Sequence, residues 1–219
     1  MPMDSMSFDE IRHWAYAAVF CDVLDSMGLR NQSPRAVLKA WTTPHVLVGR
    51  CKTTLWEEVD GEDPRPYELE LQAVDDCKPD EILVCAAGGS MSSGIWGELL
   101  STAAMNQGCI GAVVDGCVRD TRQMTAMEFP VYAVGTSIYD SLHRQRVTAI
   151  DVPVVMGGVE VTPGDLLIVD VDGAVVVPSA IEQQVTQLAY KKVHDENMTR
   201  EAIRGGMKAT EAYDKYGVL

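Results

Sequence analysis

The sequence has few basic residues. Its 219 residues include 18 lysines and arginines against 32 aspartates and glutamates, which gives a formal net charge of −14. A surface of this charge repels the phosphates of DNA and RNA, so we expect no nucleic-acid partner. An acidic protein that binds an anionic substrate needs a local positive charge, which a basic side chain or a bound metal ion can supply.

Long hydrophobic runs and targeting signals are also missing. The chain has no uninterrupted apolar stretch of the roughly 18 residues that a membrane-spanning helix needs. Its first residues, MPMDSMSFDEIRHW, carry acidic side chains and lack the basic start and apolar centre of a signal peptide. We therefore expect a cytoplasmic protein with no membrane partner.

The common cofactor and nucleophile motifs are absent too. None of the six cysteines forms a CxxC pair, which argues against a zinc site and favours buried, reduced thiols. The chain has no GxGxxG or GK[ST] motif for nucleotides and no GxSxG motif for a nucleophilic serine. These absences argue against a zinc site, a nucleotide-binding loop and a serine hydrolase.

The pattern of apolar residues predicts an α/β protein. Residues 8–28 are expected to form one helix, with Ser7 and Glu10 as its capping box. Further along, strands and helices alternate, which predicts parallel strands joined by right-handed crossovers. The expected elements are strands over 46–56, 82–87, 110–114 and 131–134, helices over 67–76, 95–106 and 119–127, a loop over 88–94 and a turn at Asp115-Gly116.

The last third of the chain has a different pattern. Residues 146–177 contain short β-rich runs separated by Gly and Pro, which indicates an antiparallel or barrel-like part. The sequence VDVDG within it predicts a tight hairpin turn. From residue 180 onward the sequence is helical and charged. We expect one domain over residues 1–219, with a helical tail over 180–219 that packs on a neighbouring subunit.

Two predicted strand ends carry the candidate site. In GGSMSSGIWGELL, glycines allow a tight turn, and the helix that follows presents free N–H groups to an anion. In VVDGCVRD, Arg119 and Asp120 follow the next strand, so the two segments are expected to share one cleft. Arginine binds carboxylates and aspartate suits Mg²⁺. Taken alone, the first segment could also be an ordinary turn, and the second a surface ion pair.

At this point the sequence resembles a known family. The run GGSMSSGIWGELLSTAAMNQGCIGAVVDGCVRD, with the later VTPGDLLIVDVDGAVVVP, is similar to the RraA-like family, which includes the 4-hydroxy-4-methyl-2-oxoglutarate (HMG) aldolases. The resemblance spans nearly the whole chain and is densest over 85–178. The family signature, an acidic residue followed after twenty residues by Arg-Asp, is met by Glu98, Arg119 and Asp120.

The resemblance implies a fold and an assembly. The fold is a swivelling β/β/α domain, with helices around a β-sandwich or barrel-like core and a C-terminal helical extension. The assembly is a homotrimer or homohexamer.

The resemblance also implies roles for individual residues. Asp120 would hold Mg²⁺, Mn²⁺ or another divalent ion, and Arg119 would contact the keto oxygen of a 2-oxo acid. Glu98 would hold metal-bound water, and a tail glutamate of a neighbouring subunit, Glu196 or else Glu201, would complete the water network. The substrate carboxylate would meet backbone N–H groups of Ser93, Gly94, Ile95, Trp96, Gly97, Glu98, Leu99 and Leu100.

The implied activity is that of a lyase that cleaves a carbon–carbon bond next to a 2-oxo acid through a pyruvate enolate, as an HMG/CHA aldolase or an oxaloacetate decarboxylase. One departure concerns Gln123, where family aldolases often have an acidic residue; it weakens the case for aldolase activity more than for enolate chemistry in general. Asp115 is a further candidate polar group at the cleft, or a residue that only stabilises a turn. The alternative function is a non-catalytic regulator that inhibits an RNA-degrading enzyme by protein contact. A methyltransferase function is disfavoured because a glycine-rich cofactor motif is missing.

Overall fold

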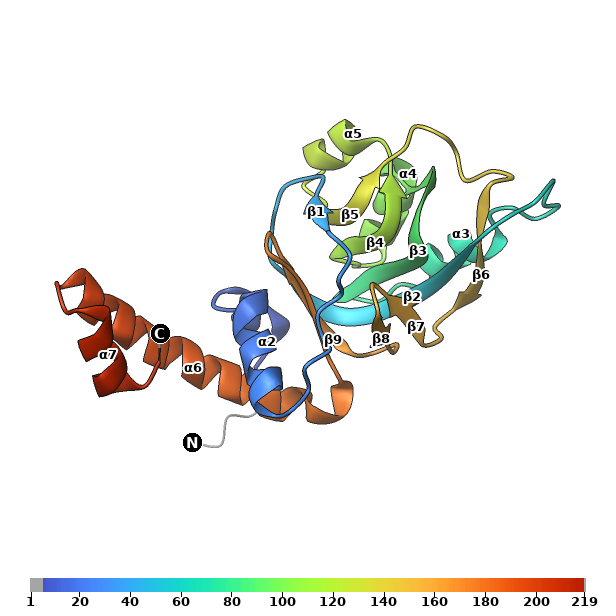
Figure 1. Ribbon diagram of the computed structural model, residues 1–219. Helices are drawn as coiled ribbons and strands as arrows, with labels where there is room; N and C mark the ends of the chain where they lie inside the picture. The colour runs from blue at the N-terminus through green and yellow to red at the C-terminus, as the bar shows by residue number, and fades with distance from the viewer. Residues whose placement is uncertain (1–5, 219) are drawn as a thin grey trace.

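The computed structural model describes residues 6–218 and has a mixed α/β fold (Figure 1). The strands are β1 (Lys39–Ala40), β2 (Leu47–Glu58), β3 (Glu81–Trp96), β4 (Gly111–Val118), β5 (Val131–Thr136), β6 (Gln145–Ile150), β7 (Val154–Met156), β8 (Val159–Val161), β9 (Leu166–Asp170) and β10 (Gly173–Val177). The helices are α1 (Phe8–Arg12), α2 (Ala17–Ser26), α3 (Glu68–Asp75), α4 (Glu98–Asn106), α5 (Thr121–Ala126), α6 (Glu182–Arg204) and α7 (Ala209–Tyr216), with a 3₁₀ turn at Ser179–Ile181.

The parallel part of the sheet matches the predicted alternation. Strands β2, β3, β4 and β5 pair in parallel in that order, and α3, α4 and α5 form the connections between them. Every residue of β4 is buried, as expected for a strand covered on both faces. One face packs in a core cluster that includes Leu83, Trp96 and Phe129. This layered packing fixes the end of β4, where Arg119 and Asp120 follow.

Antiparallel strands complete the sheet. Strand β9 pairs with both β2 and β10, β6 pairs with β2, and β7 and β8 form a separate ribbon. The sheet order β1-β5-β4-β3-β2-β9-β10 curls into a nearly closed, barrel-like arrangement (Figure 1). The predicted hairpin is present, since Asp172 N–H donates to Asp170 at 2.9 Å between β9 and β10. The prediction of an antiparallel, barrel-like part over 146–177 is confirmed.

The prediction of one helix over 8–28 is wrong. The capping box of Ser7 and Glu10 is present, but α1 ends at Arg12 and α2 begins only at Ala17. Tyr16 is extended, and the N–H of Ala17 donates to the carboxylate of Asp170 at 2.7 Å. A carboxylate at the end of β9 thus fixes the start of α2. This contact joins residues 153 positions apart, so it leaves no trace in the local pattern.

The loop over 88–94, the turn at Asp115-Gly116 and the helix start at Ile95 also need correction. Strand β3 continues to Trp96 and leaves its regular register with β4 at three places, so the loop is a set of bulges within a strand. Asp115 lies inside β4, opposite Ala86. Burial raises the pKa of Asp115, and N–H groups of Gly157 and Gly89 partly oppose this. Asp115 is therefore a buried strand residue rather than a turn residue.

The C-terminal helices extend away from the sheet (Figure 1). The first half of α6 buries Val185, Ala189 and Val193 in a cluster with α2, whereas Met198 and Tyr213 further along the tail are exposed. Packing of the tail over 180–219 on a neighbouring subunit stays a prediction. None of the helices within residues 6–218 has both the length and the hydrophobicity needed to cross a lipid bilayer.

Candidate active site

A cleft of about 280 Å³ lies where β3 and β4 end, between α3 and α4. It brings together residues from four parts of the chain that are distant in sequence. The lining residues are Tyr67, Glu70, Leu71, Gly94, Ile95, Trp96, Gly97, Leu99, Leu100, Arg119, Asp120, Asp140 and Ser141. The expectation that the two glycine-flanked segments share one cleft is met.

Two glycines allow β3 to pass close to the end of β4. A Cβ atom at Gly94 would lie 2.5 Å from the carbonyl oxygen of Ser137 and 3.0 Å from Cβ of Arg119. A Cβ atom at Gly97 would lie 2.6 Å from Oδ2 of Asp120. Real Cβ atoms do not approach so closely, so Gly94, which faces a backbone oxygen, needs glycine, whereas a Cβ atom at Gly97 would push the Asp120 carboxylate aside. The backbone of β3 thereby comes into contact with the two charged side chains.

The guanidinium of Arg119 is held by Asp140. Nη2 of Arg119 lies 2.8 Å from Oδ2 of Asp140, and both side chains are about one-third exposed, at 34% and 37%. Asp140 in turn accepts hydrogen bonds from Tyr67 Oη and from Leu142 N–H, each at 2.9 Å. Burial alone would raise the pKa of Asp140, but these bonds and Arg119 outweigh it and lower the pKa. The ionised carboxylate of Asp140 therefore fixes the orientation of the Arg119 guanidinium.

Asp120 has an unusual backbone conformation. Its φ of 57° places it in the left-handed region, at the residue that precedes α5. Aspartate tolerates this conformation better than most residues, and such strained positions cluster at functional sites. The turn sets Oδ2 of Asp120 3.8 Å from Nε of Arg119 and 3.4 Å from the N–H of Glu98, at the start of α4. One carboxylate therefore faces both the cation and the end of α4.

The donor set fits a metal ion bound through one aspartate. Residues 6–218 contain no group of three or more His, Cys, Asp or Glu side chains that could enclose a metal ion. However, Mg²⁺ is commonly held by one or two carboxylates, with water and substrate oxygens as its other ligands. The Asp120 side chain is 39% exposed and makes no capping bond to α5, so its oxygens can serve in this way.

The other predicted site residues lie in different places. The backbone of Glu98 reaches Asp120, but its carboxylate accepts a bond from Thr102 Oγ1 at 2.9 Å and does not line the cleft. Ser93 is fully buried and donates to Gln145. Leu99 and Leu100 do line the cleft, and the first turn of α4 leaves their N–H groups without a helical partner.

The tail glutamates are not in the cleft of their own chain. Glu196 in α6 accepts a hydrogen bond from Tyr16 and lies 3.9 Å from Arg200. Glu201 pairs with Arg204 at 2.7 Å. The role assigned to Glu196 concerns the site of a neighbouring subunit, so it stays a prediction.

Five cleft residues were missed by the sequence reasoning, namely Tyr67, Glu70, Leu71, Asp140 and Ser141. Tyr67 and Asp140 are 73 positions apart and meet only through the fold. Glu70 did carry a signal, because in α3 it shares the buried face with Ala73 and Val74, at the i, i+3, i+4 spacing of an apolar stripe. An acidic residue in such a stripe is a buried charge that requires an explanation.

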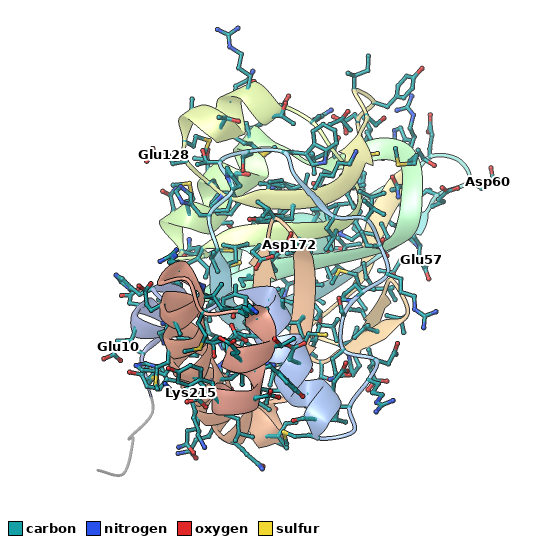
Figure 2. The ribbon with its side chains drawn as sticks, turned by 60° about the vertical axis from the view of Figure 1, so that its left-hand side comes forward. Glu10, Glu57, Asp60, Glu128, Asp172 and Lys215 are labelled. Carbon is teal, nitrogen blue, oxygen red and sulfur yellow. The ribbon has the colours of Figure 1, made fainter. Side chains whose placement is uncertain are left out.

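The surface around the molecule is acidic. Figure 2 shows Glu10, Glu57, Asp60 and Glu128 pointing outward, and all four are exposed. An anionic substrate therefore meets unfavourable charge over much of the protein. The guanidinium of Arg119 is the one cationic side chain among the residues that line the cleft, where it lies beside the carboxylates of Asp120 and Asp140.

Comparison with known proteins identifies similar sequences. Residues 17–176 match the profile of the RraA-like family, described as Aldolase/RraA. A protein of Halalkalibacterium halodurans named "Putative 4-hydroxy-4-methyl-2-oxoglutarate aldolase" is 36% identical over 143 residues, which are 65% of this chain and 68% of that protein. A protein of Aromatoleum aromaticum with the same name is 34% identical over 46% of this chain. That match covers 63% of the relative, less than two thirds of its length.

Solved structures agree with the sequence matches. An uncharacterized protein from Pseudomonas syringae superposes with a TM-score of 0.85 at 25% identity and 99% coverage of both chains. RraAS2 from Streptomyces coelicolor, described as an unusual member of the RNase ES inhibitor RraA protein family, superposes with a TM-score of 0.79 at 27% identity. Coverage there is 91% of this chain and 99% of RraAS2. The similarity therefore extends to the whole fold.

Proposed function

Because this chain belongs to the RraA-like (Aldolase/RraA) family, we propose that it is a divalent-metal-dependent lyase that cleaves a carbon–carbon bond next to a 2-oxo acid. One observation carries the proposal: Arg119, Asp120 and the N-terminal turn of α4 line a single cleft. A binding protein that acts only through its outer surface has no need of this arrangement. The names of the relatives support aldol cleavage as the reaction class.

Each of these groups can serve one part of a 2-oxo acid. The free N–H groups at the start of α4 suit the substrate carboxylate. The guanidinium of Arg119, already aimed by Asp140, suits the keto oxygen, where negative charge develops as the bond breaks. Asp120 would hold Mg²⁺ or Mn²⁺, and a neighbouring subunit's Glu196 would hold water nearby. Glu98 could share that role only if its carboxylate left Thr102 and turned toward the cleft. When bound, the divalent ion supplies Lewis-acid stabilisation of the enolate charge.

The deciding experiment measures pyruvate release from oxaloacetate and from HMG, with Mg²⁺ or with EDTA. We expect enzyme-dependent release from at least one substrate and a fall of at least about tenfold on chelation, because the ion stabilises the charge that forms. Since Mg²⁺ alone promotes oxaloacetate decarboxylation, the rate without protein is subtracted. Release that is unaffected by EDTA would contradict the metal requirement.

A second candidate function rests on the likeness to RraAS2. In this case the protein would act as a non-catalytic regulator that inhibits an RNA-degrading enzyme by contact. The same assay distinguishes the two functions. Absence of metal-dependent pyruvate release from both substrates would favour the regulator, and a pull-down of an RNA-degrading enzyme would then be the next measurement.

The contact between Gly97 and Asp120 gives a further prediction. We expect Gly97→Ala to weaken Mg²⁺ binding roughly five- to hundredfold, because overpacking costs about 1–3 kcal/mol and the new methyl group would displace the Asp120 carboxylate. Titration calorimetry measures the effect. Gly205→Ala is the matched control, since its Cβ would meet only backbone oxygens at 3.4 Å. An equal change in both variants would contradict the prediction.

A further inference from the structure

Glu70 is an acidic side chain in an apolar setting. It belongs to the buried face of α3, is only 8% exposed and lines the same cleft as Arg119. Its Oε2 atom is fully buried and has no hydrogen-bond partner among the described residues. Burial of an unpaired carboxylate is costly, so a carboxyl in this position favours its neutral, protonated form.

The neighbouring charges strengthen this preference. Burial first, and then repulsion from Asp140, raise the pKa of Glu70 to about 8, although Arg119 opposes the change. Tyr67, which precedes α3, and Cys85 on β3 also lie within electrostatic reach of Glu70. Helix α3 packs against α4 and β6 as well, but their charged residues Glu98 and Arg146 bond to Thr102 and Asp63.

We propose that Glu70 is the acid that delivers a proton to C3 of the enolate, an inference that rests on the proposed lyase function. Three features of its place in the fold support this role. Glu70 lines the cleft that contains Arg119 and Asp120, its Oε2 atom has no hydrogen-bond partner among the described residues, and the side chain is almost fully buried. Arg119, which would hold the keto oxygen, lines the same cleft as Glu70, and C3 of the substrate is only two bonds from that oxygen.

The proton balance of the step is simple. When the bond between C3 and C4 breaks, its electron pair becomes the C2–C3 double bond of the enolate, and the C2 carbonyl pair moves onto oxygen. The carboxyl of Glu70 then gives its proton to C3, the enolate collapses to the ketone of pyruvate, and Glu70 becomes a carboxylate. In aldol cleavage the proton lost from the C4 hydroxyl restores it; in decarboxylation a proton from solvent does so.

The test separates bond cleavage from proton transfer. Pyruvate is incubated with the Mg²⁺-loaded enzyme in D₂O, and exchange of its methyl protons is followed by NMR, while decarboxylation of oxaloacetate is measured in parallel. We expect Glu70→Gln to lose exchange by about a hundredfold or more, the usual effect of a general acid–base group. Decarboxylation should fall less than about tenfold, because the bond breaks before the proton is needed.

Glu68→Gln is the matched control. Glu68 lies on the same helix, pairs with Arg65 at 2.9 Å and does not line the cleft, so both activities should stay near wild type. Exchange at the wild-type rate in Glu70→Gln would overturn the proposal. A wild-type enzyme that neither decarboxylates oxaloacetate nor exchanges pyruvate protons would instead overturn the lyase function, and the two failures are distinguishable.

Thermal unfolding of the metal-free protein gives a readout that is independent of activity. With a pKa near 8 in the folded protein and 4.5 as its ordinary value, Glu70 is ionised in the unfolded chain between these pH values and takes up a proton on folding. Folding then stabilises the protonated form, so its stability contribution is lost as pH rises toward 8. The Tm of Glu70→Gln relative to wild type should rise by about 2–4 °C or more from pH 5 to pH 8.5. A constant difference would contradict a buried, protonated Glu70.

Discussion

Replacement of Asp120 by alanine is expected to weaken Mg²⁺ binding by about a hundredfold or more and to abolish metal-dependent turnover, since an ion with few protein ligands depends on each of them. The other two carboxyls that line the cleft are engaged differently. Asp140 pairs with Arg119, and Glu70 is buried. Titration calorimetry with Mg²⁺, together with pyruvate release, measures both effects.

Asp120→Asn is the matched control for the backbone. Alanine in the left-handed conformation of Asp120 costs about 1–2 kcal/mol, whereas asparagine adopts it readily. The asparagine variant should therefore keep the wild-type Tm and still lose metal affinity, because an amide oxygen is a weaker ligand than a carboxylate. If either variant bound Mg²⁺ as tightly as the wild type, the assignment of Asp120 as the ligand would be wrong.

Replacement of Arg119 by alanine is expected to lower kcat by about 10²–10³ while Mg²⁺ affinity changes little. The magnitude is that of removing one fixed donor from a developing negative charge. Stability should hardly change, because ion pairs at partly exposed side chains such as Arg119 and Asp140 contribute only about 0–1 kcal/mol. Steady-state kinetics, metal titration and Tm together measure these three quantities.

Arg119→Lys tests what the guanidinium provides beyond its charge. Lysine keeps the positive charge but loses the planar, forked geometry that can contact Asp140 and the substrate at once. We expect an intermediate kcat, between those of alanine and arginine. A kcat of wild-type size in Arg119→Ala would show that the cation takes no part in the chemistry, and a loss of metal binding there would give Arg119 a different role.

The sequence predicted those parts of the fold that depend on local patterns. The strands β2 to β5 and their helices carry apolar periods and glycine stops, and these elements were found in the expected order. The break between α1 and α2 was missed because it depends on a bond from Ala17 to Asp170. The bulges of β3 were read as a loop, since a strand that leaves its register and returns contains the same glycines as a turn.

The sequence predicted the part of the candidate site that directly follows the ends of strands. Arg119 and Asp120 are adjacent in sequence, and the strand-end rule was enough to place them beside Gly94 and Gly97. The bonds from Tyr67 to Asp140 and from Asp140 to Arg119, which orient the guanidinium, could not be predicted in the same way. Asp140 comes from the connection between β5 and β6, and nothing in its local sequence distinguishes it from other exposed aspartates.

The grouping of the Arg119 guanidinium with the carboxylates of Asp120 and Asp140 affects the order in which ligands bind in the cleft. While Glu70 holds its proton, these three charged side chains leave the empty cleft slightly negative. A divalent cation reverses the sign, and a monoanion such as pyruvate then brings the pocket close to neutrality. Under the proposed function, the metal ion should therefore bind before the anion, and ionisation of Glu70 at alkaline pH should disturb this order.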